Sequence, residues 1–291
     1  MDCKSLLISI TGGLLLPEME IISVIVSCFN NWRTVQLTLF SLEVQTDRCF
    51  QVTLADDGSN EAFRREVEQF RATTVLPIEH VWHPDQGFRK ASILNKALWG
   101  AKCRYLLFTD GDIVLRADWV FQHRLAARRN TFMAGGSHIN IPKDLQQRIT
   151  RSEIQQQCLF DYRWLSDNGV SSARRIRLRL GTYGWRARLL DALTACRDSF
   201  VGCSTGCWKE DVERVGGFDE TFGYGGEDRD LGIRLANAGV RGVRKRYSFA
   251  CVHMDHSRPY SDPVEVARCK ALLKERRRRG ITHLARKPEA S

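Results

Sequence analysis

The stretch YLLFTDGD, residues Tyr105 to Asp112, decides how the rest of this chain is interpreted. Its run of apolar and aromatic residues predicts a short strand that is buried on both faces, as in a parallel sheet. Two acids separated by a glycine follow, at the carboxyl end of the strand, where open α/β sheets bind their ligands. Carboxylates there suit a divalent cation that also holds a phosphate, although Asp and Gly are equally common in simple turns.

Composition narrows the class of protein. The 291 residues allow one large domain or two small ones, and 43% hydrophobic with 27% charged residues is typical of a globular chain with a sizeable core. The net charge of +10 suits an anionic substrate or an anionic membrane surface. No nucleic-acid partner is expected, because the sequence has no zinc-finger spacing, RNA-binding aromatic signature or Walker loop. The ten cysteines are scattered, several inside apolar runs, which indicates buried thiols in a reducing cytosol.

Strands and helices are expected to alternate after a short leading segment. β-branched and apolar runs predict strands at residues 21–27, 50–55, 78–82 and 105–108, with helical patterns between them. This order, with short connections, is typical of a parallel, doubly wound sheet. Because no GxGxxG follows the first strand, a dinucleotide site is disfavoured. Arg89 and Lys90 open one of the helices and could meet a diphosphate at its positive end.

The second half contains another group of acids and histidines. Glu227 and Asp228 follow two glycines, which leave the backbone room to approach a ligand, and they open an apolar helix. A strand is expected at residues 248–252, ending at His253 and His256. An imidazole there could complete a metal shell begun by Asp112. The sequence leaves open which histidine does so, and we favour His253 because it lies closest to the strand end.

Several motifs, in one order, resemble those of family 2 glycosyltransferases with the GT-A nucleotide-sugar fold. They are VIVSCFN at residues 24–30, ADDGS at 55–59 and DGD at 110–112. GGFDE at 216–220 and FGYGGED at 222–228 are similar to the acceptor segment of β-1,4-galactosyltransferases and bacterial chondroitin polymerases, and FRKASILN at 88–95 resembles their donor-diphosphate segment. The resemblance implies a single large α/β domain with a Rossmann-like GT-A fold, in which helices flank a central, mostly parallel sheet.

The resemblance also implies roles for matching residues. The donor-binding set would be Ser27, Asn30, Asp57, Phe88, Arg89, Lys90, Asn95 and Asp110. Within it, Asp57 would contact uracil and Asp110 the ribose or donor sugar. Glu227, Tyr224 and Gly226 would bind the acceptor, and Asp228 would be the catalytic base. Asp112 with His253 or His256 would hold Mn²⁺ or Mg²⁺. Tyr224 stands where the galactosyltransferases have tryptophan, so the acceptor platform is expected to differ.

The chain divides into five segments on this interpretation: an N-terminal extension at 1–18, a nucleotide-sugar donor-binding half at 19–142, a basic insert of unknown role at 143–200, an acceptor and catalytic half at 201–260, and a basic C-terminal helix or tail at 261–291. The extension is too short to span a bilayer, and a weak signal peptide is its alternative. Within the insert, residues 174–190 combine arginines with apolar and aromatic residues. They predict contact with an anionic membrane or acceptor, or a helix with solvated arginines.

We therefore expect a metal-dependent, inverting glycosyltransferase that moves a sugar from a nucleotide sugar to a hydroxyl of a glycan or lipid-linked acceptor. Among nucleotide sugars, we favour a UDP-sugar as the donor. It would serve cell-surface polysaccharide synthesis in the cytoplasm, with peripheral contact to the inner face of the cell membrane. One alternative is a sugar-phosphate nucleotidyltransferase, which usually needs a glycine-rich basic loop where this chain has residues 28–31. Another is a non-catalytic carbohydrate-binding protein on the same fold, which the intact Asp112 and Asp228 disfavour.

Overall fold

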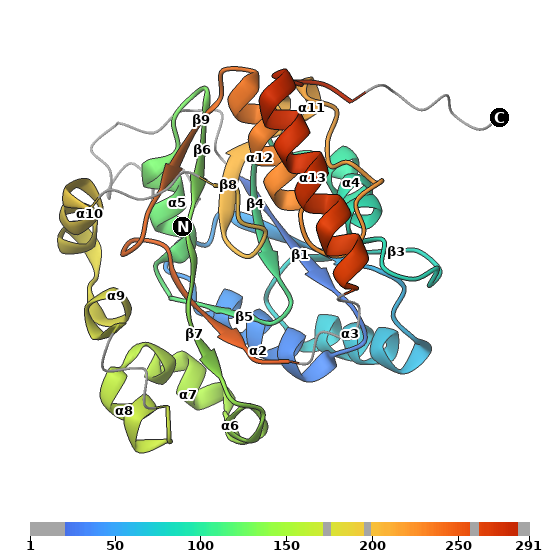
Figure 1. The fold of residues 1–291 in the computed structure, drawn as a ribbon. Coiled ribbons are helices and arrows are strands. Elements are labelled where there is room, and N and C mark those ends of the chain that lie inside the picture. Colours follow the sequence, from blue (N-terminus) through green and yellow to red (C-terminus); the bar gives the residue numbers. More distant parts are fainter. Residues whose placement is uncertain (1–20, 171–175, 195–198, 257–261, 285–291) are drawn as a thin grey trace.

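The computed structural model describes residues 21–170, 176–194, 199–256 and 262–284. The N-terminal extension expected at 1–18 lies outside these residues, as do Arg174 and Arg175 of the insert. Within the described part, seven strands form a central sheet in the order β3-β2-β1-β4-β8-β6-β9, and three form a smaller sheet in the order β5-β10-β7 (Figure 1). The strands are β1 (Ile22–Cys28), β2 (Phe50–Asp56), β3 (Ile78–Trp82), β4 (Tyr105–Asp110), β5 (Ile113–Leu115), β6 (Thr131–Ala134), β7 (Gly136–Ile141), β8 (Thr205–Trp208), β9 (Arg241–Arg244) and β10 (Ala250–Met254).

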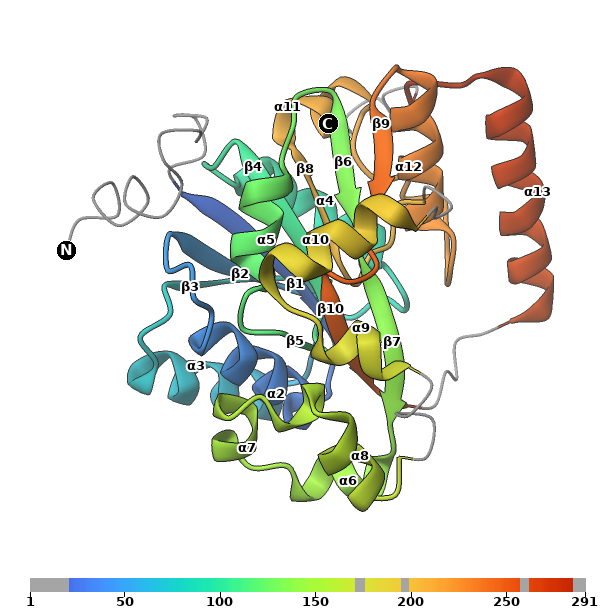
Figure 2. The same ribbon diagram turned by 90° about the vertical axis from the view of Figure 1, so that its left-hand side faces the viewer.

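Helices cover both faces of the central sheet (Figures 1 and 2). On one face, alternate residues of β1 such as Val24 and Val26 pack with α2, α3 and α5. On the other, Ile25 packs with α4, α11 and α12. The helices are α2 (Trp32–Glu43), α3 (Glu61–Thr73), α4 (Lys90–Gly100), α5 (Trp119–Ala126), α6 (Lys143–Arg148), α7 (Arg151–Gln155), η2 (Cys158–Phe160, a 3₁₀ turn), α8 (Tyr162–Asp167), α9 (Arg177–Gly181), α10 (Gly184–Leu193), α11 (Lys209–Arg214), α12 (Glu227–Asn237) and α13 (Pro263–Arg279).

The alternating first half is confirmed. β1 pairs in parallel with both β2 and β4, and β2 pairs in parallel with β3. Local sequence sets the helix starts: the Asn31 side chain accepts the amide of Thr34 at the start of α2, and Asn60 does the same for Phe63 at the start of α3. Because these strands are parallel, their carboxyl ends all lie along one edge of the sheet.

Two features bring the second half of the chain to that edge. β8 runs antiparallel between β4 and β6, so residues 205–208 lie inside the central sheet although we did not predict a strand there. In the smaller sheet, β10 is antiparallel to β5 and parallel to β7. That pairing carries the end of β10 back to the turn after β4.

The basic insert forms a group of short helices, α6 to α10, on one side of the molecule, whereas α13 lies along another face (Figure 2). In the described part of the C-terminal basic segment, residues Pro263–Arg279 form the helix α13. Arg276 pairs with Asp219 and Asp230, while Arg277, Arg278 and Arg279 are exposed. Among the described residues, no helix combines the length and apolar character that a membrane span requires.

Candidate active site

Three side chains of metal-ligating type converge beside the carboxyl end of β4. Asp112 Oδ2 lies 2.9 Å from Nε2 of His256 and 3.5 Å from Nε2 of His253. The strand register explains this, because His253 is paired with Ile113, the residue after Asp112. The amide of Met254 also donates to the carbonyl oxygen of Asp112 at 2.8 Å. One ligand atom from each of the three side chains lies within 4.8 Å of the other two.

Two buried polar atoms of the cluster side chains lack hydrogen-bond partners among the described residues. These atoms are Asp112 Oδ1 and His253 Nδ1. Burial alone would raise the pKa of Asp112, but the hydrogen bonds and charges of His253 and His256 outweigh it and hold this pKa well below its ordinary value. One carboxylate and two imidazoles suit a first-row divalent ion such as Mn²⁺, and so few protein ligands leave coordination positions for phosphate oxygens.

Asp110 is held by two side chains at the end of β4. Ser27 Oγ and Lys90 Nζ each donate to Asp110 Oδ1 at 2.6 Å. Ser27 reaches it because β1 and β4 place Ser27 opposite Asp110. The Lys90 ammonium also lies 3.8 Å from Glu227 Oε1. Burial would lower the pKa of Lys90, but the charges of Asp110, Glu227 and Asp228 raise it well above its ordinary value, so Lys90 is a cation here.

The acids of the second half open α12 from a glycine turn. Gly225 and Gly226 have φ angles of +81° and +136°, a region that side chains with a Cβ rarely adopt. A Cβ added at Gly226 would also crowd the Phe222 ring at 3.1 Å. The turn therefore requires glycine, and it presents the first two residues of α12 to the edge of the sheet.

Glu227 and Asp228 have different surroundings. Glu227 is only 6% exposed, and its pKa is raised by burial, which outweighs the lowering effect of Lys90 and is reinforced by the charge of Asp228. Asp228 is partly exposed, and its Oδ2 accepts the amide of Gly202 at 3.1 Å. Asp228 is thus the accessible carboxylate of the two, whereas Glu227 is enclosed.

Asp57 organises the loop between β3 and α4. His83 Nε2 lies 2.8 Å from Asp57 Oδ1, and the amide of Arg89 donates to Asp57 Oδ2 at 2.9 Å. Burial raises the pKa of Asp57, against the lowering effect of these two partners. The Arg89 guanidinium is hydrogen-bonded to Gln86. A nucleobase bound at Asp57 would have to share the carboxylate oxygens with His83 and the Arg89 amide.

The donor and acceptor segments touch through two aromatic rings. The Phe88 and Tyr224 rings meet edge to face, with centroids 5.4 Å apart. Since Phe88 directly precedes Arg89 and Tyr224 precedes the glycine turn, this contact brings the loop before α4 against the turn before α12.

Two residues of the expected donor set have structural partners. The side-chain amide of Asn95 exchanges two hydrogen bonds with the backbone of Phe218, at 2.8 and 2.9 Å, and donates to Glu220, and its donor-binding role stays a prediction. It is 6% exposed and ties α4 to the turn before the acceptor segment. Asn30 also ties two loops together, because its Oδ1 accepts the amide of Asn60 at 2.8 Å.

Sequence reasoning missed two contributors to this edge. Gly202, whose amide contacts Asp228, has nothing in its local sequence that marks it. His83, the partner of Asp57, follows the third strand by one residue, and that position at the carboxyl edge is a signal that could have identified it.

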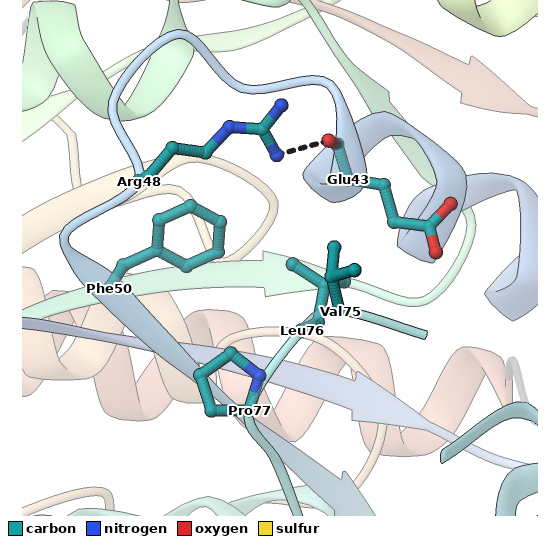
Figure 3. A pocket seen from close by; sticks show the side chains of 6 residues that line it. All are labelled: Glu43, Arg48, Phe50, Val75, Leu76 and Pro77. Atoms are coloured by element: carbon teal, nitrogen blue, oxygen red, sulfur yellow. Dashed lines mark hydrogen bonds between the residues drawn. The ribbon is translucent and has the colours of Figure 1, made fainter. Parts of the chain in front are cut away.

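A pocket elsewhere contains none of these groups. It is lined by Glu43, Arg48, Phe50, Val75, Leu76 and Pro77 (Figure 3). Phe50 begins β2, and Pro77 directly precedes β3, so this pocket lies toward the amino ends of the strands. The hydrogen bond drawn in this view is donated by the Arg48 guanidinium to the backbone carbonyl oxygen of Glu43. The carboxyl edge is therefore the candidate active site.

Two family profiles match the chain, one after the other. The profile described as glycosyl transferase family 2 matches residues 23–190, and that described as the N-terminal domain of galactosyltransferase matches residues 195–257. The first match includes β1 to β4 and Asp112. The second includes Tyr224, Glu227, Asp228 and both histidines.

Individual relatives are distant and longer. The chain is 27% identical over 234 residues to a chondroitin synthase of Escherichia coli, covering 75% of this chain and 32% of the relative. It is also 27% identical over 264 residues to a validoxylamine A glucosyltransferase of Streptomyces hygroscopicus, covering 85% of this chain and 58% of the relative. A mannosyltransferase of Pyrobaculum calidifontis, solved with GDP-Man and Mn²⁺, has a similar fold, with a TM-score of 0.58 and 18% identity over 92% of this chain and 65% of that one.

Proposed function

This chain belongs to glycosyl transferase family 2 and has the GT-A fold, and on that premise we propose that it transfers a sugar from a nucleotide sugar to an acceptor hydroxyl with inversion at the anomeric carbon. The proposed donor is a UDP-sugar, and the proposed acceptor is a glycan or a lipid-linked saccharide in polysaccharide synthesis. The chondroitin synthase relatives support a polysaccharide product. The chain spans about a third or less of those relatives, so the identity of donor and acceptor belongs to the proposal.

One observation carries the proposal: the donor segment and the acid pair meet at a single cation. Lys90 Nζ lies 2.6 Å from Asp110 and 3.8 Å from Glu227, and Asp228 directly follows Glu227. A diphosphate bound beside Lys90 would therefore leave its attached sugar near the Asp228 carboxylate. A nucleotidyltransferase has no need of an acceptor base at this position, and membership of family 2 also weighs against that alternative.

The chemistry assigns a task to each residue. Asp228 accepts the proton of the acceptor hydroxyl while the oxygen of that hydroxyl attacks the anomeric carbon of the donor sugar. At the same time, the bond from the anomeric carbon to the diphosphate oxygen breaks. In this proposal, Glu227 hydrogen-bonds an acceptor hydroxyl rather than deprotonating it. Direct displacement with one base inverts the anomeric configuration. A divalent ion held by Asp112 with His253 and His256 would supply a Lewis acid that neutralises the leaving diphosphate.

The residues around the donor position it for this step. Ser27 and Lys90 fix Asp110, which is proposed to face the ribose or the donor sugar. Phe88 and Tyr224 form a shared wall between donor and acceptor. Tyr224 adds a hydroxyl and a smaller ring than tryptophan, so we expect an acceptor preference different from that of the galactosyltransferases.

A donor panel with active-site variants tests the proposal. The protein is incubated with Mn²⁺ and a series of UDP- and GDP-sugars, and release of the nucleoside diphosphate is measured with candidate acceptors. Asp228→Asn should bind the preferred donor normally but turn it over at least about a hundredfold more slowly, because the positioned base is lost. Glu227→Gln should mainly raise the KM for the acceptor. Asp144→Asn, an exposed acid on α6, serves as the matched control.

Two results would refute this assignment. Near-normal turnover by Asp228→Asn would show that another group is the base. Release of a nucleoside monophosphate or pyrophosphate instead of a diphosphate would point to nucleotidyl transfer.

A further inference from the structure

An apolar surface lies on α9 and α10, within the basic insert. Among the described residues, ten large apolar side chains are exposed, and five of them fall between residues 178 and 193. These five are Leu178, Tyr183, Trp185, Leu189 and Leu193, with exposed fractions from 42% to 72%. Scattered single apolar residues are normal on a protein surface, but a contiguous group marks an interaction site. We call this group the α9–α10 patch.

The patch forms one stripe along α10. Trp185, Leu189 and Leu193 follow one another at spacings of four residues, so they lie on the same side of the helix. Ala187 and Asp191, on the opposite side, are buried against the protein. α10 therefore presents its most apolar side to the solvent, the reverse of an ordinary surface helix.

Arginines border this stripe. Arg186 and Arg188 are exposed and leave the helix on either side of the line through Trp185 and Leu189. The Arg186 guanidinium lies 5.5 Å from the Trp185 ring. Residues 176–194 hold four arginines and a single acid, Asp191, which is buried. The exposed face thus combines apolar and aromatic side chains with uncompensated positive charge.

Two buried charged groups attach this face to the rest of the fold. The fully buried Arg116 donates to the carbonyl oxygen of Thr182 at 2.7 Å and lies over the Tyr183 ring at 4.3 Å. Asp191 accepts the amides of Tyr247 and Ser248, at 2.8 and 3.1 Å. Arg116 follows β5 directly and Ser248 precedes β10, so both anchors join the patch to the two strands that carry Asp112 and His253 at their ends.

We propose that the α9–α10 patch docks on an anionic lipid membrane, with α10 lying in the interface. Trp185, Leu189 and Leu193 enter the boundary between head groups and acyl chains, and the arginines meet lipid phosphates. The charge of the patch favours this occupant over a neutral apolar partner. A protein docked in this way would have its active site near lipid-linked acceptors. That consequence rests on the proposed function, whereas the docking itself does not.

Vesicle sedimentation of the full chain tests the proposal. The protein is mixed with vesicles of phosphatidylcholine, with or without phosphatidylglycerol, and the pelleted fraction is measured against lipid concentration. We expect pelleting only with the anionic lipid, and less of it as salt rises, since salt screens exposed charges. The triple variant Trp185→Gln, Leu189→Gln and Leu193→Gln keeps helix-forming residues and should need at least about tenfold more lipid.

A charge-matched pair separates the patch from general basicity. Arg186→Ser with Arg188→Ser should weaken binding roughly fivefold for each arginine removed. Arg277→Ser with Arg278→Ser, on the exposed side of α13, removes the same charge from a different face and should leave pelleting unchanged. Circular dichroism should match the unmodified protein for every variant, which confirms the fold. Nucleotide-sugar hydrolysis in solution should also be unchanged, which separates this test from the test of the enzyme activity.

Three outcomes would overturn the proposal. The first is absence of pelleting with anionic vesicles, and the second is equal loss in the patch and α13 variants. The third is a dimer, detected by light scattering, that the triple variant abolishes without any vesicle binding, which would make a second copy of the chain the occupant.

Discussion

Replacing Lys90 by methionine removes the cation that the donor and acceptor segments share. The ammonium lies 2.6 Å from Asp110 and 3.8 Å from Glu227, and its side chain is 19% exposed. Leaving buried charges without their partner costs about 3–5 kcal/mol in a dry interior. Because this site is partly open to water, we reduce the figure to about 2–3 kcal/mol of folding free energy. The same ammonium faces the proposed diphosphate position, where losing a charged hydrogen bond worth about 1.5–3 kcal/mol should lower kcat/KM roughly 10- to 150-fold.

The loss should depend on pH. Burial already raises the pKa of Glu227, and Lys90 opposes that rise. Without Lys90 the pKa of Glu227 rises further, so Glu227 becomes protonated at a higher pH. The acidic limb of the kcat/KM profile therefore moves to higher pH. The deficit of Lys90→Met should therefore be largest at acidic pH and shrink toward alkaline pH.

The assay is turnover of the preferred nucleotide sugar across pH, with the KM values for donor and acceptor determined separately. Lys90→Arg, which keeps the charge, should recover part of the activity. Lys96→Met, an exposed lysine on the same helix, should behave like the unmodified protein. A deficit that is constant across pH and confined to the KM for the donor would refute the shared-cation reasoning and leave Lys90 as a diphosphate ligand alone.

Three further predictions concern the same edge of the sheet. Chelation with EDTA should abolish transfer, and Asp112→Ala should weaken Mn²⁺-dependent donor binding in calorimetry; full activity in excess EDTA would contradict this. Gly111→Ala should lower the free energy of unfolding by about 1–3 kcal/mol in urea denaturation. The reason is that a Cβ there would lie 2.7 Å from a Val35 methyl group and 3.0 Å from the Ser27 carbonyl oxygen. An unchanged urea midpoint would show that the turn relaxes freely. NMR of the product should show an inverted anomer, and a retained anomer would exclude Asp228 as the base of a direct displacement.

The first half of the fold was predictable because its signals are local. The apolar runs that become β1 to β4 are continuous and bounded by polar turns, and Asn31 and Asn60 cap the helices between them. β8 was not predictable in this way. The sequence TGCW shows no clear alternation, and the strand exists because β4 and β6 pair with it from far away in the chain.

At the site, the types of residue involved could be predicted more reliably than the directions in which their side chains point. The sequence left open whether His253 or His256 joins Asp112, because both lie at the end of the same strand. The structure brings both imidazoles close to Asp112. Asn95 belongs to a motif, but a helix position does not reveal which side its side chain faces, and this one turns toward Phe218. Gly202 acts through its amide alone, so no side chain could have indicated its contact with Asp228.

The donor and acceptor halves that the sequence suggests are joined too closely to act as separate modules. β8 follows the insert along the chain, yet it lies between β4 and β6 of the preceding half. His253 is held beside Ile113 by the pairing of β10 with β5, and Lys90 joins Asp110 to Glu227 across the same boundary. Neither half contains a complete site, because the metal-ligating cluster and the shared cation each draw on both. Expressing residues 19–142 alone would therefore remove the antiparallel neighbour of β4 and expose one long edge of the sheet, and we expect that fragment to aggregate rather than to bind donor.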